Sequence, residues 1–192
     1  NDQAVRFGTE IIFDVATEVD FSERPFKVTT YGEKFTADTL IITTGAAAVT
    51  LDIPGEEEMI GRGVSYCATC DGHFFKGMEV VVVGGGDSAL EEALYLTHHA
   101  SKVTIVHRRD ELRAGSILKQ RAEENDKIHF IWDSVLTEIP EGEKVESVKV
   151  KNLKTDEESD MRTEGVFIFI GHTPNTELFE GKLTLDDQGY IV

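Results

Sequence analysis

Short apolar segments alternate with polar and glycine-rich stretches along the chain. In the first 45 residues, three β-prone segments are separated by turn-forming or charged residues, and we expect strands at Ile11–Val15, Phe26–Thr30 and Thr39–Thr43. Residues 51–63 then combine Pro54 with glycines around an acidic run, which predicts a loop or linker. This part of the chain is therefore predicted to form short strands that lead into a linker.

A different pattern begins at Met78. The continuous apolar segment Met78–Val83 leads through three glycines into residues 87–99, whose apolar positions are spaced for one buried helix face. Further strands are expected at Val103–Val106 and Ile128–Trp132, with a second helix over about Gly115–Asn125. This strand–helix–strand–helix–strand order predicts a parallel sheet with crossover helices, because parallel strands need long connections.

The following residues, 135–164, are predicted to form an antiparallel insertion. Val145–Leu153 alternates apolar and charged residues, Lys154–Asp160 suits a polar turn, and Val166–Ile170 has the composition of a strand buried on both faces. The pattern as a whole predicts an α/β fold, with a Rossmann-like domain built on a parallel sheet and interrupted by an antiparallel β insertion.

The glycines after the Met78–Val83 strand fit the pattern G-x-G-x-x-A, which runs through Gly84, Gly85, Gly86, Asp87, Ser88 and Ala89. In this motif the first glycine permits a tight turn, the second lets the backbone approach a pyrophosphate, and the small third residue lets helix and strand pack closely. The helix N-terminus then offers unpaired N–H groups to the phosphates. The motif and its context predict dinucleotide binding, with a purely structural glycine turn as the alternative.

The end of the next strand discriminates between nucleotides. NAD sites usually place a carboxylate about 20 residues after the glycines to bind the ribose 2′-hydroxyl. That position is occupied here by His107, Arg108 and Arg109, with Arg113 a turn later. Guanidinium groups pair with a 2′-phosphate in a bidentate way, so NADPH is favoured over NADH. The alternative is a solvated basic patch that pairs with Asp110 and Glu111.

The composition of the chain limits the kinds of partner that it is expected to bind. The formal net charge of −17 disfavours nucleic acid and anionic lipid, since an acidic surface repels both. No apolar run reaches the roughly 18 residues that a membrane span needs. The two cysteines, Cys67 and Cys70, are too few and too close for a secreted disulfide scaffold, which favours a cytoplasmic protein.

The C-x-x-C pair is either redox-active or metal-binding. Two intervening residues let the thiols of Cys67 and Cys70 close a small disulfide ring. A structural zinc needs four ligands, and only His73 lies nearby in sequence, so no metal site is expected. Asp71, directly after the second thiol, is a candidate acid or base for thiol proton transfer, or alternatively a helix N-cap.

These motifs together resemble low-molecular-weight thioredoxin reductase. The resemblance lies in residues 63–72, 82–89, 107–114 and 170–175, and Leu185–Val192 continues it, so it covers essentially the whole chain. It implies an oxidoreductase, an NADPH-dependent thioredoxin-disulfide reductase that uses FAD and a redox-active dithiol. The flavoprotein subunit of alkyl hydroperoxide reductase shares this core and is one alternative, and a non-catalytic NADPH-binding module is another.

The resemblance also implies a domain layout. Residues 1–49 and 171–192 would belong to a partial FAD domain, and residues 50–170 would form the NADPH-binding domain with the dithiol. The family's two FAD motifs, an early G-x-G-x-x-G and a late Gly-Asp, do not occur in the 192 residues. We therefore expect a fragment that is inactive on its own.

Individual roles follow from the resemblance as well. Cys70 would be the thiol beside the flavin, Cys67 the thiol that attacks the thioredoxin disulfide, and Asp71 the residue that gives and takes protons. The positions that match NADPH contacts are Ser88, Arg108 and Arg113 and, more loosely, His107, Arg109 and Ile170. The intact enzyme is expected to be a cytoplasmic homodimer with thioredoxin as its partner.

Overall fold

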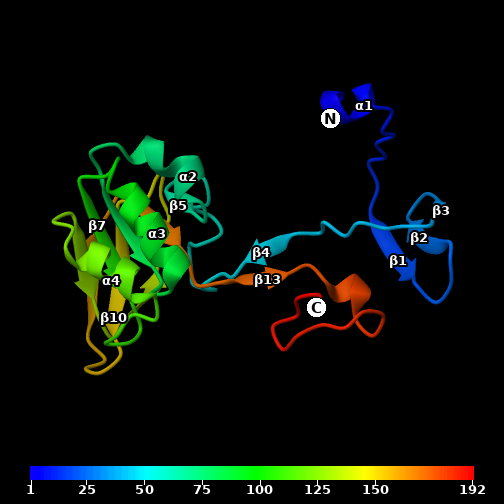
Figure 1. Cartoon of the computed structure of the whole chain (residues 1–192). Helices are drawn as coiled ribbons and strands as arrows, with labels where there is room; N and C mark the ends of the chain where they lie inside the picture. The colour runs from blue at the N-terminus through cyan, green and yellow to red at the C-terminus, as the bar shows by residue number, and fades with distance from the viewer. The chain divides into compact units, whose positions relative to one another are not determined.

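The computed structural model describes all 192 residues and divides them into two compact units. Asn1–Ala47 and Thr173–Val192 form one unit, called here the split unit, and Ala48–His172 form the other, called the central unit (Figure 1). The predicted α/β class is confirmed, because a five-stranded parallel sheet occurs together with helices and smaller antiparallel sheets. The assignment of each unit to a cofactor stays a prediction.

The split unit is built on a three-stranded antiparallel sheet. It contains the short helix α1 (Asp2–Arg6), the strands β1 (Ala16–Asp20), β2 (Phe26–Thr30) and β3 (Lys34–Ala37), and the 3-10 helix η2 (Glu177–Phe179). Phe179 of η2 is buried and stacks on Phe21, with the ring centroids 6.4 Å apart. The C-terminal segment of the split unit, Thr173–Val192, thus packs through η2 on the end of β1.

Two strands predicted in this unit are absent. Residues 11–15 and 39–43 have no regular structure, although β2 begins and ends at the predicted residues. A β-prone composition becomes a strand only where a neighbouring backbone supplies hydrogen-bond partners. Here β2 takes both of its partners from more polar segments, β1 and β3.

A two-stranded sheet lies at the boundary between the units. Strand β4 (Ala46–Ala48) pairs with β13 (His172–Pro174), and the boundary falls within both strands. The backbone N–H of Val49 continues the pairing by donating to the carbonyl of Gly171 at 3.0 Å. The two chain passages between units therefore run as a bonded pair.

The central unit contains the parallel sheet. Its strands, in spatial order, are β5 (Val64–Ser65), β12 (Gly165–Ile168), β6 (Glu79–Val83), β7 (Lys102–Val106) and β8 (Ile128–Ile131). Its helices are α2 (Ala68–Asp71), the 3-10 helix η1 (Gly72–Phe75), α3 (Asp87–Leu96) and α4 (Ser116–Glu123). No helix of the structure is long and apolar enough to cross a bilayer.

The predicted antiparallel insertion is present, but the boundaries of its strands differ from the predicted ones. Strand β10 (Ser147–Asn152) lies between β9 (Ser134–Glu138) and β11 (Glu158–Arg162). Residues 158–160 were predicted to belong to a polar turn and instead form part of β11. The charged side chains of Glu158 and Asp160 suit an edge strand, where exposed charge also discourages pairing with other chains.

The parallel sheet is buried on both faces, and its strands alternate between two hydrophobic clusters. Val80 and Val82 pack in the cluster that includes Leu90 and Leu96 of α3, while Val81 packs in the cluster with the antiparallel insertion. Figure 1 shows α3 and α4 on the near face of this sheet. Helices, parallel sheet and antiparallel sheet thus form three layers, and the carboxyl ends of β6, β7 and β12 share one edge.

Candidate functional site

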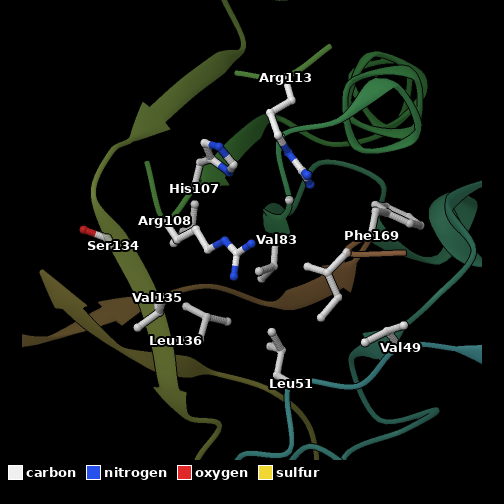
Figure 2. Close-up of a pocket in the computed structure, with 14 residues that line it drawn as sticks. Val49, Leu51, Val83, His107, Arg108, Arg113, Ser134, Val135, Leu136 and Phe169 are labelled. Atoms are coloured by element: carbon white, nitrogen blue, oxygen red, sulfur yellow. The ribbon is translucent and has the colours of Figure 1, made fainter. Parts of the chain in front are cut away.

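A cavity of about 320 Å³ lies at that edge, where open α/β sheets bind their ligands (Figure 2). It lies wholly within the central unit and is lined by Val49, Leu51, Val83, Gly84, Gly85, Val106, His107, Arg108, Arg113, Ser134, Val135, Leu136, Phe169 and Ile170. Aliphatic and aromatic side chains form much of its wall. Figure 2 shows the guanidinium groups of Arg108 and Arg113 directed toward its centre.

Two glycines of the turn after β6 are required by packing. Gly84 has φ 145°, a left-handed conformation, and a Cβ there would collide with the carbonyl oxygen of Phe169. A Cβ on Gly85 would collide with the imidazole of His107. Ala89, the small residue of the motif, is fully buried beneath the turn, where its Cβ would lie 2.8 Å from a Cβ on Gly84.

Gly86 is different, because nothing in the chain itself requires a glycine there. Its φ of −94° suits any residue, and a Cβ would meet no atom within 4 Å. It is the N-cap of α3, so the space above it faces the unpaired N–H groups of the first helical turn. A glycine that leaves open space at a helix N-terminus fits the close approach of a pyrophosphate.

His107 lies behind this turn rather than in front of it. It is 4% exposed, and its Nε2 lies 3.1 Å from the carbonyl oxygen of Glu111. Burial, and secondarily the neighbouring arginines, lower the pKa of His107. A neutral ring that faces a carbonyl must carry its proton on Nε2 and donate it. His107, predicted to contact the cofactor, therefore also holds the loop that follows β7.

The arginine-bearing loop is fastened to the glycine turn at two further points. The backbone N–H of Arg113 donates to the carbonyl of Gly85 at 2.7 Å. The backbone N–H of Gly115 donates to the Asp87 carboxylate at 2.8 Å. The start of α3 and the loop before α4 therefore hold each other in place.

The arginines are free of ion pairs, whereas their acidic neighbours are not. Asp110 pairs with Lys154 at 3.4 Å, and Glu111 pairs with Lys119 at 3.2 Å. None of the three arginines takes part in the ion pairs of the chain. The alternative of a basic patch neutralised by Asp110 and Glu111 is therefore not what the structure shows.

The cavity gathers part of the predicted nucleotide site. Gly84, Gly85, His107, Arg108, Arg113 and Ile170 line it, and Gly86, Asp87 and Ser88 lie next to it in sequence at the start of α3. Arg109 does not line it. Sequence analysis missed Phe169, which the rule of carboxyl strand ends could have found. It also missed Val49 and Leu51, which no motif indicates.

The two cysteines form a disulfide at the head of α2, with their Cα atoms 5.3 Å apart. Cys67 is the N-cap of α2, and its Sγ accepts the backbone N–H of Cys70 at 3.2 Å. The hydroxyl of Thr69 lies 3.4 Å from the same sulfur and must be the donor, since a disulfide sulfur carries no hydrogen. Cys67 is half-buried and Cys70 is exposed.

Asp71 stands at the N-cap position of η1, but its side chain makes no capping hydrogen bond to that helix. Its carboxylate instead accepts the hydroxyl hydrogen of Ser65, at 2.6 Å. The Ser65 oxygen in turn accepts the backbone N–H of Cys67 at 3.1 Å. Ser65 thus links the carboxylate to the first cysteine. No sequence signal marks this link, because β5, which carries Ser65, is defined by its pairing with β12.

A buried carboxylate lies on the other side of the dithiol segment. Glu56 is 3% exposed and accepts hydrogen bonds from the backbone N–H of Leu51 at 2.9 Å and from the hydroxyl of Tyr66 at 2.8 Å. Burial, followed by the hydrogen bond to Glu56, raises the pKa of Tyr66. The residue before Cys67 is therefore fixed to the segment that enters the central unit.

A parallel sheet with a glycine-rich turn, a cavity at its carboxyl edge and a nearby cysteine pair places the chain among α/β redox proteins. Residues 3–192 match the pyridine nucleotide-disulphide oxidoreductase family, and the chain belongs to this family.

Three proteins similar to this chain are thioredoxin reductases. The thioredoxin reductase of Rickettsia felis is 56% identical, over 99% of this chain and 63% of that protein. The thioredoxin reductase of Streptomyces coelicolor is 49% identical, over 98% of this chain and 59% of that protein. The crystal structure of Lactococcus lactis thioredoxin reductase superposes with a TM-score of 0.85 at 46% identity, over 97% of this chain and 62% of that chain. The resemblance predicted from the motifs is confirmed, and the chain spans about three fifths of the length of these relatives.

Proposed function

We propose that this chain provides the NADPH-binding and dithiol parts of an FAD-dependent thioredoxin-disulfide reductase. The observation that carries the proposal is that one helix, α3, joins both sites. Asp87 at its first turn follows the glycine turn, whereas Glu92 and Leu96 further along lie against the dithiol helix α2 and its C-cap. The nucleotide turn and the dithiol are therefore held on one rigid element.

Different residues of the site would contact different parts of the nucleotide. Gly86 and the N-terminus of α3 would hold the pyrophosphate, and Arg108 and Arg113 would hold the 2′-phosphate, with the apolar wall of the cavity against the rest of the ligand. NADPH, when bound, supplies a hydride. The chain contributes orientation and charge complementarity, and Arg109 and Ser88 are proposed as outer contacts on the motif match alone.

FAD enters the proposal only as the cofactor that the family resemblance implies for the whole enzyme. The 192 residues contain one glycine-rich nucleotide turn, which NADPH binding uses, and none is left on which an FAD pyrophosphate would rest. The chemistry that these residues can perform themselves is therefore thiol–disulfide exchange.

In the proposed exchange, the Cys67 thiolate attacks one sulfur of the partner's disulfide, and the bond between the partner's two sulfurs breaks. A mixed disulfide forms, and the displaced partner sulfur leaves as a thiolate that takes up a proton. The Cys70 thiolate then attacks Cys67 Sγ, which re-forms the Cys67–Cys70 disulfide and releases the second partner thiol. Two electrons pass to the partner, and Asp71 is placed to hold the protons that move.

The local geometry favours Cys67 as the attacking thiol. Its sulfur accepts the backbone N–H of Cys70 and the hydroxyl of Thr69, and it lies at the N-terminus of α2. Hydrogen-bond donors and a helix N-terminus stabilise a thiolate, which is the reactive species. Cys70 accepts no hydrogen bond at its sulfur.

Single-cysteine variants of the chain test the proposal. Reduced Cys70→Ser and Cys67→Ser chains are incubated with oxidised thioredoxin, and the covalent adduct is quantified by mass spectrometry. The adduct should form at least about threefold faster through Cys67 than through Cys70, because hydrogen-bond donors beside Cys67 favour its reactive thiolate. Equal rates, or no adduct from either variant, would reject Cys67 as the thioredoxin-reducing thiol.

We also propose that the whole enzyme acts in the cytoplasm as a homodimer. The confinement of cysteine to one C-x-x-C supports a reducing compartment. The support for a homodimer is the family resemblance, and sedimentation of the whole enzyme at graded concentrations would test it.

A further inference from the structure

The dithiol helix is anchored to α3 by a carboxylate. Glu92 Oε2 accepts the backbone N–H of Ala68 at 3.0 Å, and Ala68 is fully buried. Ala68 directly follows Cys67 and is the first residue of α2. The Glu92 charge therefore lies one residue from the sulfur-bearing N-cap.

No cation offsets this charge. The ion pairs of the chain all involve residues other than Glu92. Other titratable groups near α2 are Asp71 on α2 itself, Tyr66 after β5, His73 on η1, Tyr95 on α3 and His99 in the turn that follows α3. Asp71 is occupied by Ser65, and Tyr66 is occupied by Glu56.

The position of Glu92 opposes the effect of the helix on the thiol. Backbone N–H groups at the start of a helical turn stabilise a thiolate on the N-cap cysteine by hydrogen bonding. Glu92 takes one of these N–H groups and adds a negative charge beside it, which disfavours a second anion. The half-buried setting of Glu92 keeps the interaction from being fully screened.

We propose that Glu92 is a positioning residue that holds α2 on α3 and weakens the acidity of the Cys67 thiol, and so sets how readily the Cys67–Cys70 disulfide is reduced. The proposal rests on the redox role proposed for the dithiol. It adds a determinant outside the C-x-x-C motif, on the helix that begins at the nucleotide turn.

Glu92→Gln isolates the charge, because the amide oxygen can still accept the Ala68 N–H. In a Cys70→Ser background, the alkylation rate of Cys67 is followed against pH. The acidity constant of Cys67 should rise about threefold to tenfold in Glu92→Gln. Glu91→Gln is the matched control, since Glu91 is exposed on the same helix, loses the same charge and makes no side-chain hydrogen bond or ion pair with α2.

The redox consequence is measured with both cysteines present, by equilibrating the chain with glutathione. One protein disulfide and two glutathione thiols exchange for one protein dithiol and one glutathione disulfide. Stabilising the thiolate favours the dithiol, so at a pH where the Cys67 thiol is ionised, Glu92→Gln should shift this equilibrium toward the reduced chain by about threefold to tenfold. A tenfold shift is about 30 mV in reduction potential.

Glu92→Asp provides a second variant that does not depend on the behaviour of the Gln chain. It keeps the carboxylate but withdraws it by one methylene, so the Cys67 acidity should move in the same direction by a smaller factor. Acidity and glutathione equilibrium in Glu92→Gln that match Glu91→Gln would overturn the proposal, as would an unchanged Cys67 acidity in Glu92→Asp. The assay uses neither nucleotide nor thioredoxin, so its failure leaves the proposed function standing, and failure of thioredoxin trapping leaves this result standing.

Discussion

The carbonyl oxygen of Gly85 accepts the backbone N–H of Arg113 at 2.7 Å. The glycine turn that follows β6 and the arginine loop that follows β7 are therefore one structural piece, with the His107 ring filling the space beneath Gly85. This arrangement places two different demands on neighbouring glycines, one from the fold and one from the ligand. Substitutions can separate them.

Replacing Gly86 by alanine should weaken nucleotide binding without harming the fold. The new methyl group meets open space, so the free energy of unfolding should change by less than about 1 kcal/mol, with the loss of a glycine N-cap offset by lower unfolded-state entropy. The same methyl group would occupy the path of the pyrophosphate, and NADPH affinity should fall at least about tenfold by titration calorimetry.

Gly85→Ala is the control for this substitution. Its methyl group would collide with the buried His107 ring, so this variant should lose about 1–3 kcal/mol of stability in urea unfolding. If Gly86→Ala is the less stable of the two chains, or binds NADPH as tightly as wild type, the assignment of Gly86 to the ligand is wrong.

The buried His107 should make stability depend on pH in a defined direction. The pKa of His107 in the folded chain lies below the ordinary value of 6.5. Between the folded and the unfolded pKa, the unfolded chain therefore binds more protons than the folded chain. The His107 contribution should therefore be constant above the unfolded pKa and should fall as pH drops from 6.5 toward the folded pKa.

Urea unfolding between about pH 5.5 and about pH 8 measures this effect. His107→Gln, whose amide can still donate to the Glu111 carbonyl, should flatten the profile relative to wild type. His129→Gln alters an exposed histidine on β8 and should leave the profile as it is. A wild-type profile that survives in His107→Gln would contradict the neutral, loop-holding role.

The hydrogen bond from the Tyr66 hydroxyl to Glu56 should contribute more to the free energy of unfolding than an ordinary hydrogen bond. Tyr66→Phe leaves the buried Glu56 carboxylate with only the Leu51 N–H, and should cost about 1.5–3 kcal/mol in the free energy of unfolding. Tyr95→Phe, in the same unit, removes a hydroxyl that makes no hydrogen bond and should cost less than about 0.5 kcal/mol. Equal losses would mean that the Glu56–Tyr66 bond contributes nothing specific.

Much of the central unit could be predicted from sequence, because its signals are local. The apolar run before Gly84 and the helical spacing of Leu90, Ala93 and Leu96 identify β6 and α3 without reference to the rest of the chain. Strand β5 could not be found in this way, since it is two residues long and exists by pairing with β12, a hundred residues later. The split unit shows the same limit, since composition favoured two segments that have no strand beside them.

The candidate site likewise contains residues that sequence patterns indicate and contacts that they do not. Glycine and arginine spacing pointed to the proposed phosphate-binding positions, because that chemistry dictates residue types at fixed offsets. The supporting contacts depend on how distant segments pack. Ser65 is held in β5 by pairing with the distant strand β12, and Glu92 reaches Ala68 because α2 docks on α3.

The central claim is that the cavity recognises a 2′-phosphate. Arg108 and Arg113 point into it without ion-pair partners, and each can form a charge-assisted bond worth about 1.5 kcal/mol or more with a phosphate. A ribose 2′-hydroxyl offers no such charge. NADPH should therefore bind more tightly than NADH, and the Arg108→Ala/Arg113→Ala chain should lose that preference while keeping its stability.

Titration calorimetry of the 192-residue chain with NADPH and with NADH, at one ionic strength, tests this claim most directly. The account predicts an affinity for NADPH at least about tenfold above that for NADH, which corresponds to about 1.4 kcal/mol, and near-equal affinities in the double variant. Equal affinities in the wild-type chain, or a preference that survives in the double variant, would contradict it.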